Sequence, residues 1–185
     1  MVTRAQLIEL GFGSRGISDW VRAGRLHRLH RGVYAVGHDR LQVQGRWLAA
    51  VLACGPGAVL SHGSAAALWN LRGAGSGAID VTVPSRNGRG RRDGIRVHRS
   101  TRLPPEEVTV RHGIPVTTVA RTLLDQADVL EVQALRRLIA EAEYTHTFDL
   151  TALDAVVQNN PGRRGATVRG AVGGDWTRSE LEDAF

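Results

Sequence analysis

Helix-capping signals placed close together near the start of the chain constrain its fold more than any other feature. Thr3 can cap a first helix, and Gln6, three residues later, completes a capping box. Gly11-Phe12-Gly13 predicts a tight turn directly after this helix. We expect the apolar side of the helix to consist of Leu7, Ile8 and Leu10.

A second short helix is predicted after the turn. Ser14 is a favourable cap, the helix should reach Ala23, and Gly24 is placed to end it in the left-handed conformation. Apolar residues recur at helical spacing and predict the inward side of the helix: Ile17, Trp20 and Val21. Two short helices joined by a three-residue glycine turn have the proportions of a helix-turn-helix.

The next segment is basic and has the pattern of a hairpin. Arginine and histidine bracket leucine over residues 25–31, Gly32 permits a turn, and Val33–Val36 has strand propensity. We predict a short hairpin with arginine and histidine at its tip. This hairpin would be the wing of a winged helix within residues 1–45.

This N-terminal segment has the residue types that DNA recognition requires. The outward side of the second helix would present polar side chains to base edges: Arg15, Ser18, Asp19 and Arg22. Its first turn, beginning at Ser14, points backbone N–H groups where a phosphate can bind. The hairpin would contact backbone phosphates through Arg25, His27, Arg28, His30 and Arg31. A solvated charged face on an ordinary helical lobe is the less favoured alternative, because the caps, turn, apolar stripe and hairpin occur in the required order.

The distribution of charge also favours a polyanion as partner. Arginine supplies all 24 basic residues, against 18 acidic ones. Residues 1–46 hold eight arginines and three acids, residues 86–102 hold seven arginines and one acid, and residues 103–160 hold four arginines and nine acids. Such segregation indicates one surface that faces a polyanion and a different surface elsewhere. The second basic stretch, residues 86–102, could extend a DNA footprint or bind something else.

Composition and spacing argue against several other classes of protein. The sequence contains no run of 18 apolar residues and no signal-peptide layout, so we expect a cytoplasmic protein without membrane contact. The single cysteine, Cys54, excludes an internal disulfide framework and is expected to be buried.

We expect no catalytic residue, metal site or cofactor, and therefore not an enzyme. The histidines His27, His30 and His38 lack helical i, i+4 spacing and a neighbouring acidic or thiol ligand. Ser61-His62 could be combined with Asp80 as a catalytic triad, but nothing supplies a nucleophile elbow.

The remainder of the chain mixes helix and strand patterns, which predicts an α+β fold with a small sheet and C-terminal helices. Helices are expected at residues 44–54, 61–71, 117–124, 131–143, 149–158 and 163–172, and strands at 79–83, 95–98, 108–110 and 114–116. Gly173-Gly174 has the composition of a linker, and a further helix is predicted to begin at Thr177.

Four blocks of sequence occur in an order shared with a known family: residues 24–34 (GRLHRLHRGVY), 60–69 (LSHGSAAALW), 79–84 (IDVTVP) and 113–123 (GIPVTTVARTL). They resemble the AbiEi-like antitoxin family, particularly its actinobacterial members, over nearly all of residues 3–172. The resemblance implies a winged-helix domain (1–45) that binds the promoter of its own operon, and an α/β antitoxin-like domain (46–172). In the type IV toxin–antitoxin systems of that family, which we connect with phage defence, the antitoxin opposes a nucleotidyltransferase-like toxin without necessarily binding it.

The last segment carries a second resemblance. Residues 177–182 (TRSELE) are similar to the opening helix of a very-short-patch-repair-like endonuclease domain, in which a glutamate belongs to the metal site. Glu180 or Glu182 would be the match. The rest of such a nuclease is absent from the sequence, so residues 173–185 are interpreted as a linker and the first helix of an incomplete domain. We therefore expect no nuclease activity.

Three functions are compatible with the sequence. The favoured one is a sequence-specific DNA-binding antitoxin or autorepressor, plausible as a homodimer because many such regulators read paired half-sites. The second is the DNA-targeting part of a longer endonuclease-like protein whose catalytic domain is not in this sequence. The third is a protein–protein adaptor, which rests on the acidic helices in residues 117–158.

Overall fold

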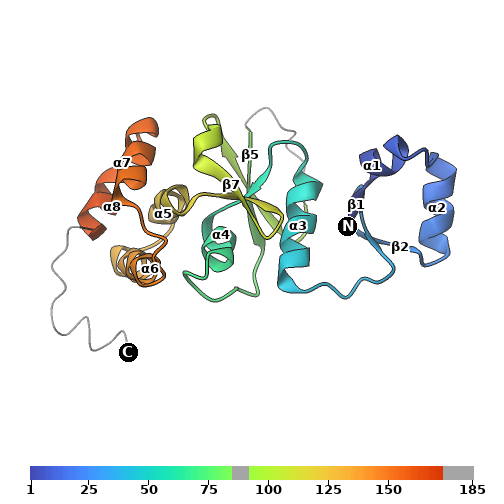
Figure 1. Cartoon of the computed structure of the whole chain (residues 1–185), viewed down its shortest axis with the longest axis horizontal. Coiled ribbons are helices and arrows are strands. Elements are labelled where there is room, and N and C mark those ends of the chain that lie inside the picture. Colours follow the sequence, from blue (N-terminus) through green and yellow to red (C-terminus); the bar gives the residue numbers. More distant parts are fainter. Residues whose placement is uncertain (85–91, 173–185) are drawn as a thin grey trace. The chain divides into compact units, whose positions relative to one another are not determined.

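The computed structural model describes residues 1–84 and 92–172. These residues form eight α-helices, one 3₁₀ helix and two β-sheets, which confirms the predicted α+β fold class (Figure 1). They divide into two compact units, each built from three segments of chain. Unit 1 comprises Met1–Leu60, Gly77–Thr101 and Val110–Pro115, and unit 2 comprises Ser61–Ser76, Arg102–Thr109 and the chain from Val116 onward. The domain ranges expected from the sequence stay a prediction.

Unit 1 begins with two short helices and a small sheet. Strand β1 (Val2–Thr3) leads into α1 (Arg4–Glu9) and α2 (Ser14–Arg22), and the hairpin of β2 (Leu26–His30) and β3 (Val33–Val36) follows. The strand order is β1-β3-β2, and both pairs are antiparallel. Two helices followed by a hairpin are compatible with the predicted winged helix (Figure 1). The sequence pattern did not predict β1, because two residues are too few to show alternation.

Local signals explain where α1 and α2 begin and end. Thr3 caps α1, and the side chains of Thr3 and Gln6 form the predicted capping box. Gly24 follows α2 with φ +67°, a left-handed conformation that glycine adopts at low cost. The cap of α2 is Gly13, not Ser14 as predicted. Ser14 is the first helical residue, and its Oγ accepts a hydrogen bond from Arg4 Nη2 at 2.7 Å.

A small hydrophobic core holds these N-terminal elements together. Its buried members are Leu7, Ile17, Leu26 and Tyr34, with Val2, Phe12 and Trp20 packed against them. Ile8 and Leu10 were predicted to share the apolar side of α1, but they are 52% and 72% exposed. For Ile8 the prediction was wrong because successive helical residues are turned by about 100°, so its side chain points away from that of Leu7. Leu10 lies after the last helical residue, Glu9.

Helix α3 (Val43–Cys54) and a five-stranded sheet follow along the chain. The strands are β4 (Val59–Leu60), β5 (Ile79–Pro84), β6 (Ile95–Ser100), β7 (Val108–Arg111) and β8 (Ile114–Thr117), in the order β6-β5-β4-β8-β7. β5 and β6 are parallel, with Ile79 opposite Ile95 and Pro84 opposite Ser100. Cys54, at the end of α3, is buried as predicted.

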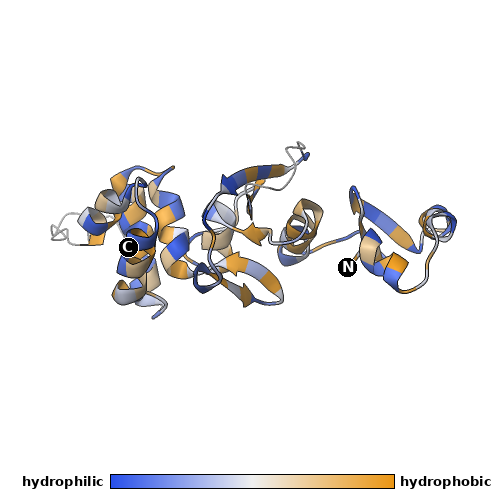
Figure 2. Ribbon diagram, turned by 90° about the horizontal axis from the view of Figure 1, so that it is seen from above, coloured by the Kyte–Doolittle hydropathy of each residue, from blue (hydrophilic) through white to orange (hydrophobic). Residues whose placement is uncertain are grey.

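Unit 2 is mainly helical. Its elements are α4 (His62–Leu68), the 3₁₀ helix η1 (Pro105–Glu107), α5 (Val119–Ala127), α6 (Val132–Tyr144), α7 (Leu150–Asn159) and α8 (Gly165–Val172). All nine residues of α5 are buried, so this helix forms the centre of the unit. Its leucines pack with Leu135, Leu153 and Val168 of the surrounding helices. Figure 2 shows hydrophobic and hydrophilic residues interspersed along the outer helices, as expected of helices with one buried side.

The predicted helices and strands match the observed ones to within a few residues at their ends. The helix expected at 61–71 ends at Leu68, and the one expected at 163–172 begins at Gly165. Most of the connection between β5 and β6 lies outside the described residues, as do the linker at Gly173-Gly174 and the endonuclease-like helix from Thr177. Within residues 1–84 and 92–172, no helix is long and apolar enough to cross a membrane.

Candidate nucleic-acid interface

Helix α2 presents a polar side to solvent. Ile17 is buried on its inner side, whereas the four residues predicted to face DNA bases are all exposed: Arg15, Ser18, Asp19 and Arg22. These four positions are spaced at i, i+3, i+4 and i+7, so they share one face of the helix. The face is therefore open to a partner along its whole length.

Two side chains on this face interact with each other. Arg22 Nη1 donates to Asp19 Oδ1 at 2.9 Å, although 79% of the Arg22 side chain and 52% of the Asp19 side chain stay exposed. Ser18 Oγ donates to the backbone oxygen of Ser14 at 3.0 Å. Arg22 is thus partly neutralised along the helix surface, whereas Arg15 forms no ion pair with any residue in the described ranges.

The residues beside α2 fix its orientation. The rings of Phe12 and Trp20 meet edge to face, with 4.8 Å between centroids and 77° between planes. The guanidinium of Arg25 lies over the Trp20 ring, 5.6 Å from its centroid. Arg25, predicted as a phosphate contact, therefore also links the end of α2 to the start of the hairpin.

The hairpin presents arginines to solvent and holds histidines closer to the fold. Arg28 and Arg31 are exposed, whereas His27 and His30 are half-buried. His27 Nε2 lies 3.2 Å from the backbone oxygen of Gly37. Burial, and then the positive charge of Arg92, lower the pKa of His30 below its usual 6.5. The lowered pKa favours the neutral form of the His30 ring.

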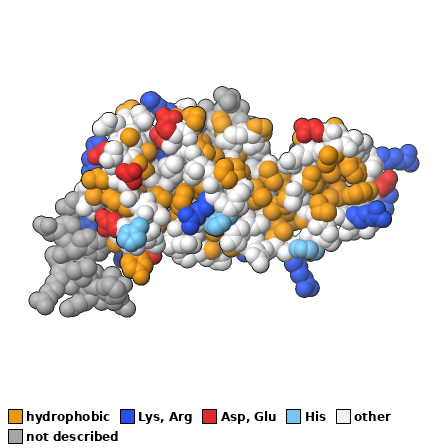
Figure 3. All heavy atoms as spheres, viewed as in Figure 1, with side chains coloured by type: hydrophobic (Ala, Val, Ile, Leu, Met, Phe, Trp, Pro, Cys, Tyr) orange, Lys and Arg blue, Asp and Glu red, His pale blue; other side chains and the backbone are white. Residues whose placement is uncertain are grey.

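The tip of the hairpin is tied to the first helix. Gly32 makes the turn with φ +78°, and its carbonyl accepts a hydrogen bond from the backbone N–H of Arg4 at 2.8 Å. The strand register shifts between Arg28 and His30, an irregularity that redirects side chains along the strand. Figure 3 shows arginine side chains projecting from the surface around the N-terminal elements.

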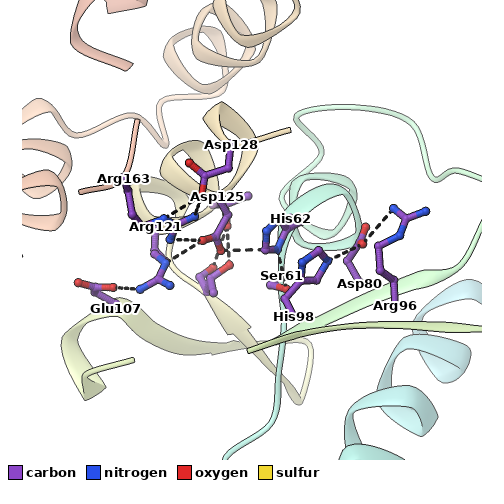
Figure 4. A network of polar contacts seen from close by, with 12 residues as sticks. Ser61, His62, Asp80, Arg96, His98, Glu107, Arg121, Asp125, Asp128 and Arg163 are labelled. Carbon is purple, nitrogen blue, oxygen red and sulfur yellow. Dashed lines mark hydrogen bonds and ion pairs between the residues drawn. The ribbon is translucent and has the colours of Figure 1, made fainter. Parts of the chain in front are cut away.

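A buried cluster of charged residues in unit 2 was not predicted from the sequence. Arg121 of α5 is 2% exposed, pairs with Glu107, and donates from Nε to Asp125 Oδ1 at 2.9 Å (Figure 4). Asn160 Nδ2 donates to Glu107 Oε1 at 2.8 Å, and Arg163 Nη1 donates to Asp125 Oδ1 at 2.8 Å. The i, i+4 spacing of Arg121 and Asp125 was a usable local signal. The other three residues come from distant segments.

This buried cluster is best interpreted as part of the fold. Burial opposes the charge of Arg163, but the carboxylates of Asp125 and Asp128 outweigh it and raise the pKa of the guanidinium. A buried charge is tolerated when opposite charges and hydrogen bonds surround it. Each arginine here contacts two carboxylates, so the cluster joins η1, α5 and the segment after α7.

The contacts of Ser61 and His62 differ from those of a catalytic triad. His62 Nδ1 lies 3.0 Å from Ser61 Oγ and 3.9 Å from Asp125 Oδ2, so one ring nitrogen faces both groups. A triad uses the two ring nitrogens separately. Asp80, the acid considered from the sequence, lies 2.9 Å from His98 Nε2. In the part of the chain that the structure describes, no group of three or more His, Cys, Asp or Glu side chains is arranged to hold a metal ion.

The N-terminal elements are also the part of the chain with a family match. Residues 1–37 match the family model described as "Transcriptional regulator, AbiEi antitoxin". The matched segment contains α1, α2 and the hairpin, and with them all ten residues predicted to contact DNA. The resemblance to this family is therefore confirmed for the N-terminal segment, and beyond residue 37 it stays a prediction.

The fold of the whole chain resembles a solved structure. The crystal structure of the RV2827C protein from Mycobacterium tuberculosis superposes with a TM-score of 0.54 and 18% sequence identity, covering 99% of this chain and 74% of that one. At this identity the likeness concerns the fold alone. A search of curated proteins finds no match.

Proposed function

We propose that the protein is a DNA-binding transcriptional regulator of the AbiEi antitoxin type, which represses its own operon in a type IV toxin–antitoxin or phage-defence setting. The observation that carries the proposal is the exposed polar face of α2 beside an arginine-bearing hairpin, within the segment that matches the regulator family. In this proposal the protein is not itself an enzyme. A nucleotidyltransferase-like toxin encoded nearby would be opposed functionally, with or without physical contact.

In the proposed complex, α2 enters the major groove. The guanidinium groups of Arg15 and Arg22 suit the O6 and N7 atoms of guanine, and the Asp19 carboxylate can accept from the amino group of cytosine. Backbone phosphates would be contacted by the first turn of α2 at Ser14 and by the basic residues Arg25, His27, Arg28, His30 and Arg31. A homodimer would place two copies of α2 one helical turn apart, about 34 Å along the DNA.

A mobility-shift assay on DNA from upstream of the gene tests this proposal. Contact with about six phosphates should make log K fall with log salt concentration at a slope of about −5. Arg22→Ala combined with Arg28→Ala should abolish the shift. As a matched control, Arg72→Ala combined with Arg164→Ala removes the same charge from exposed positions in unit 2. Absence of a salt-sensitive shift, or equal binding by the two double variants, contradicts the proposal.

The second candidate is that the chain is the DNA-targeting part of a longer endonuclease-like protein. It rests on the resemblance of residues 177–182, which lie outside the described residues. Sequencing the gene past codon 185 discriminates between the two candidates, because a nuclease reading frame favours the longer protein and an immediate stop codon removes it.

The adaptor function has one supporting observation in unit 2. Tyr144, Val129 and Leu150 expose large hydrophobic side chains there. Isolated exposed hydrophobic residues are common on monomers, so this observation is weaker than the polar face of α2. A pulldown that captures a protein partner unaffected by DNA competition would favour the adaptor.

A further inference from the structure

Described residues from the two basic stretches of the sequence border one cavity in unit 1. The cavity has a volume of about 530 Å³ and is lined by Arg28, Leu29, His30, Arg31, Ala53, Arg92 and Asp93. Arg28 and Arg31 come from the hairpin, whereas Arg92 belongs to the stretch at residues 86–102 whose role the sequence left open. Three arginines from segments about 60 residues apart in sequence therefore border one cavity.

The structure holds Arg92 in place at this cavity. Its Nε donates to the backbone oxygen of Ala53, near the end of α3, at 2.9 Å. Its backbone forms an isolated bridge with Ile95, the first residue of β6. Because both its backbone and its side chain are bonded within unit 1, Arg92 belongs to the frame of the cavity.

The charges around the cavity favour an anion. Among the lining residues that the structure describes, Asp93 is the sole acid, against three arginines. Burial and the neighbouring Arg92 lower the pKa of His30, which shows that the positive charge of Arg92 is felt at the hairpin. Arg28 and Arg31 have no ion-pair partner among the described residues. A phosphate group would reduce the repulsion between the guanidinium groups and accept several hydrogen bonds from them.

We propose that this cavity binds a phosphate group of the DNA backbone, so that Arg92 belongs to the DNA interface although it lies outside the segment that matches the regulator family. The proposal rests on the proposed function and deepens it. The volume lies within the range of ligand-binding pockets, so a sugar–phosphate segment of a nucleic acid is a suitable occupant. A phosphorylated small molecule carries the same chemistry, and the experiment separates the two sources.

The experiment compares Arg92→Gln with Arg96→Gln in the full chain. Both variants remove one arginine charge from unit 1, but Arg96 does not line the cavity and pairs instead with Asp80 at 3.4 Å. We expect Arg92→Gln to weaken DNA binding by about 3- to 10-fold and to make the salt slope less steep by about 1. Arg96→Gln should bind like the wild type. Asp93→Asn removes the acid among the described lining residues and lies outside the interface proposed for α2 and the hairpin, so it should strengthen DNA binding and repeats the test if Arg92→Gln lowers the melting temperature.

A second arm titrates inorganic pyrophosphate and follows the amide resonances of His30, Ala53 and Asp93. If the wild type binds DNA and neither Arg92→Gln nor Asp93→Asn changes the affinity, the cavity proposal is overturned while the proposed function stands. If the wild type fails to bind DNA, the proposed function fails. The pyrophosphate titration then shows whether the cavity binds a phosphate group at all. Saturable chemical-shift changes in the wild type that are lost in Arg92→Gln then assign the cavity to a phosphorylated small molecule. Absence of chemical-shift changes overturns the cavity proposal.

Discussion

Arginine occupies two contrasting environments in the two units of this protein. In the N-terminal elements of unit 1, Arg15, Arg28 and Arg31 are exposed and have no ion-pair partner among the described residues. In unit 2, Arg121 is almost fully buried and Arg163 largely so, and carboxylates bind both of them (Figure 4). The same residue type is therefore open to solvent in one unit and forms an internal connection in the other.

The contrast shows why net charge alone does not locate a DNA-binding surface. A buried arginine has its charge offset by the carboxylates that surround it, so it adds little to the field that a distant phosphate experiences. An exposed arginine is solvated, contributes little to folding, and keeps its hydrogen-bond donors for a partner. Mutations should therefore affect folding in one unit and binding in the other.

The largest expected effect is on folding, in unit 2. Arg121→Ala leaves the buried Glu107 without its cation and removes one of the two arginines that contact Asp125, and it should lower the free energy of unfolding by about 3–5 kcal/mol. Urea unfolding followed by circular dichroism measures this loss. Arg72→Ala, at an exposed position of the same unit, is the control and should change the value by less than about 0.5 kcal/mol. Similar losses in the two variants would contradict the conclusion that buried arginines stabilise the fold more than exposed ones do.

The next largest effect is on DNA binding, in unit 1. Arg15→Ala should weaken binding to the operator by about 1–3 kcal/mol, because the proposed bidentate contact to a base would be lost. Its free energy of unfolding should stay within about 0.5 kcal/mol of the wild type, because the side chain is exposed. Fluorescence anisotropy measures the affinity for DNA, and urea unfolding of the same preparations measures the free energy of unfolding. A loss of stability without a loss of affinity would place Arg15 with the structural arginines.

The exposed ion pair of Asp19 and Arg22 on α2 should contribute less to stability than the buried ion pairs of unit 2. Asp19→Asn breaks the contact with Arg22 and should change the free energy of unfolding by less than about 1 kcal/mol, because both side chains are largely solvated. It should strengthen binding to random-sequence DNA, since it removes a negative charge from the face that is proposed to approach DNA. Anisotropy with random DNA tests this expectation. Unchanged or weaker binding would count against contact between this face and DNA.

The smallest effect concerns pH. The pKa of His30 is lowered in the folded protein by burial and by Arg92, so the unfolded chain binds more protons as the pH falls towards and below 6.5. Folding stability should therefore decrease slightly as the pH falls through this range. His30→Gln should flatten that part of the pH dependence, measured as melting temperature between pH 5 and pH 8. A wild-type dependence that survives in His30→Gln must come from other groups.

Sequence reasoning succeeded where the determining signals are local. The capping box of Thr3 and Gln6, the left-handed Gly24 and the turn at Gly32 each depend on residues within a few positions of one another. Alternation likewise located strands β5 and β6, although it does not reveal that they pair in parallel. The exposed face of α2 follows from its helical spacing, so the positions of its four polar residues were also predictable.

Contacts between distant segments could not be predicted. Glu107 precedes Arg121 by 14 residues and Asn160 follows it by 39, and no periodic pattern connects them. Arg92 and the hairpin residues line the same cavity because α3 and the segment just before β6 lie beside the hairpin, which is likewise a contact between distant segments. Ser14 had the residue type of a cap, but Gly13 already provides the extended backbone before α2, and the Ser14 hydroxyl bonds Arg4 instead.

The way in which the chain alternates between the two units limits how this architecture can be exchanged or engineered. Each unit is assembled from three separate stretches of polypeptide, so no single cut yields either unit as a continuous piece. Recombination can therefore replace the N-terminal helices and hairpin as one cassette, because residues 1–37 are contiguous. The five-stranded sheet and the helices of unit 2 alternate along the chain and must be inherited together. If the proposed function holds, exchanging the cassette would change the base contacts of α2 and leave the rest of the chain as it is.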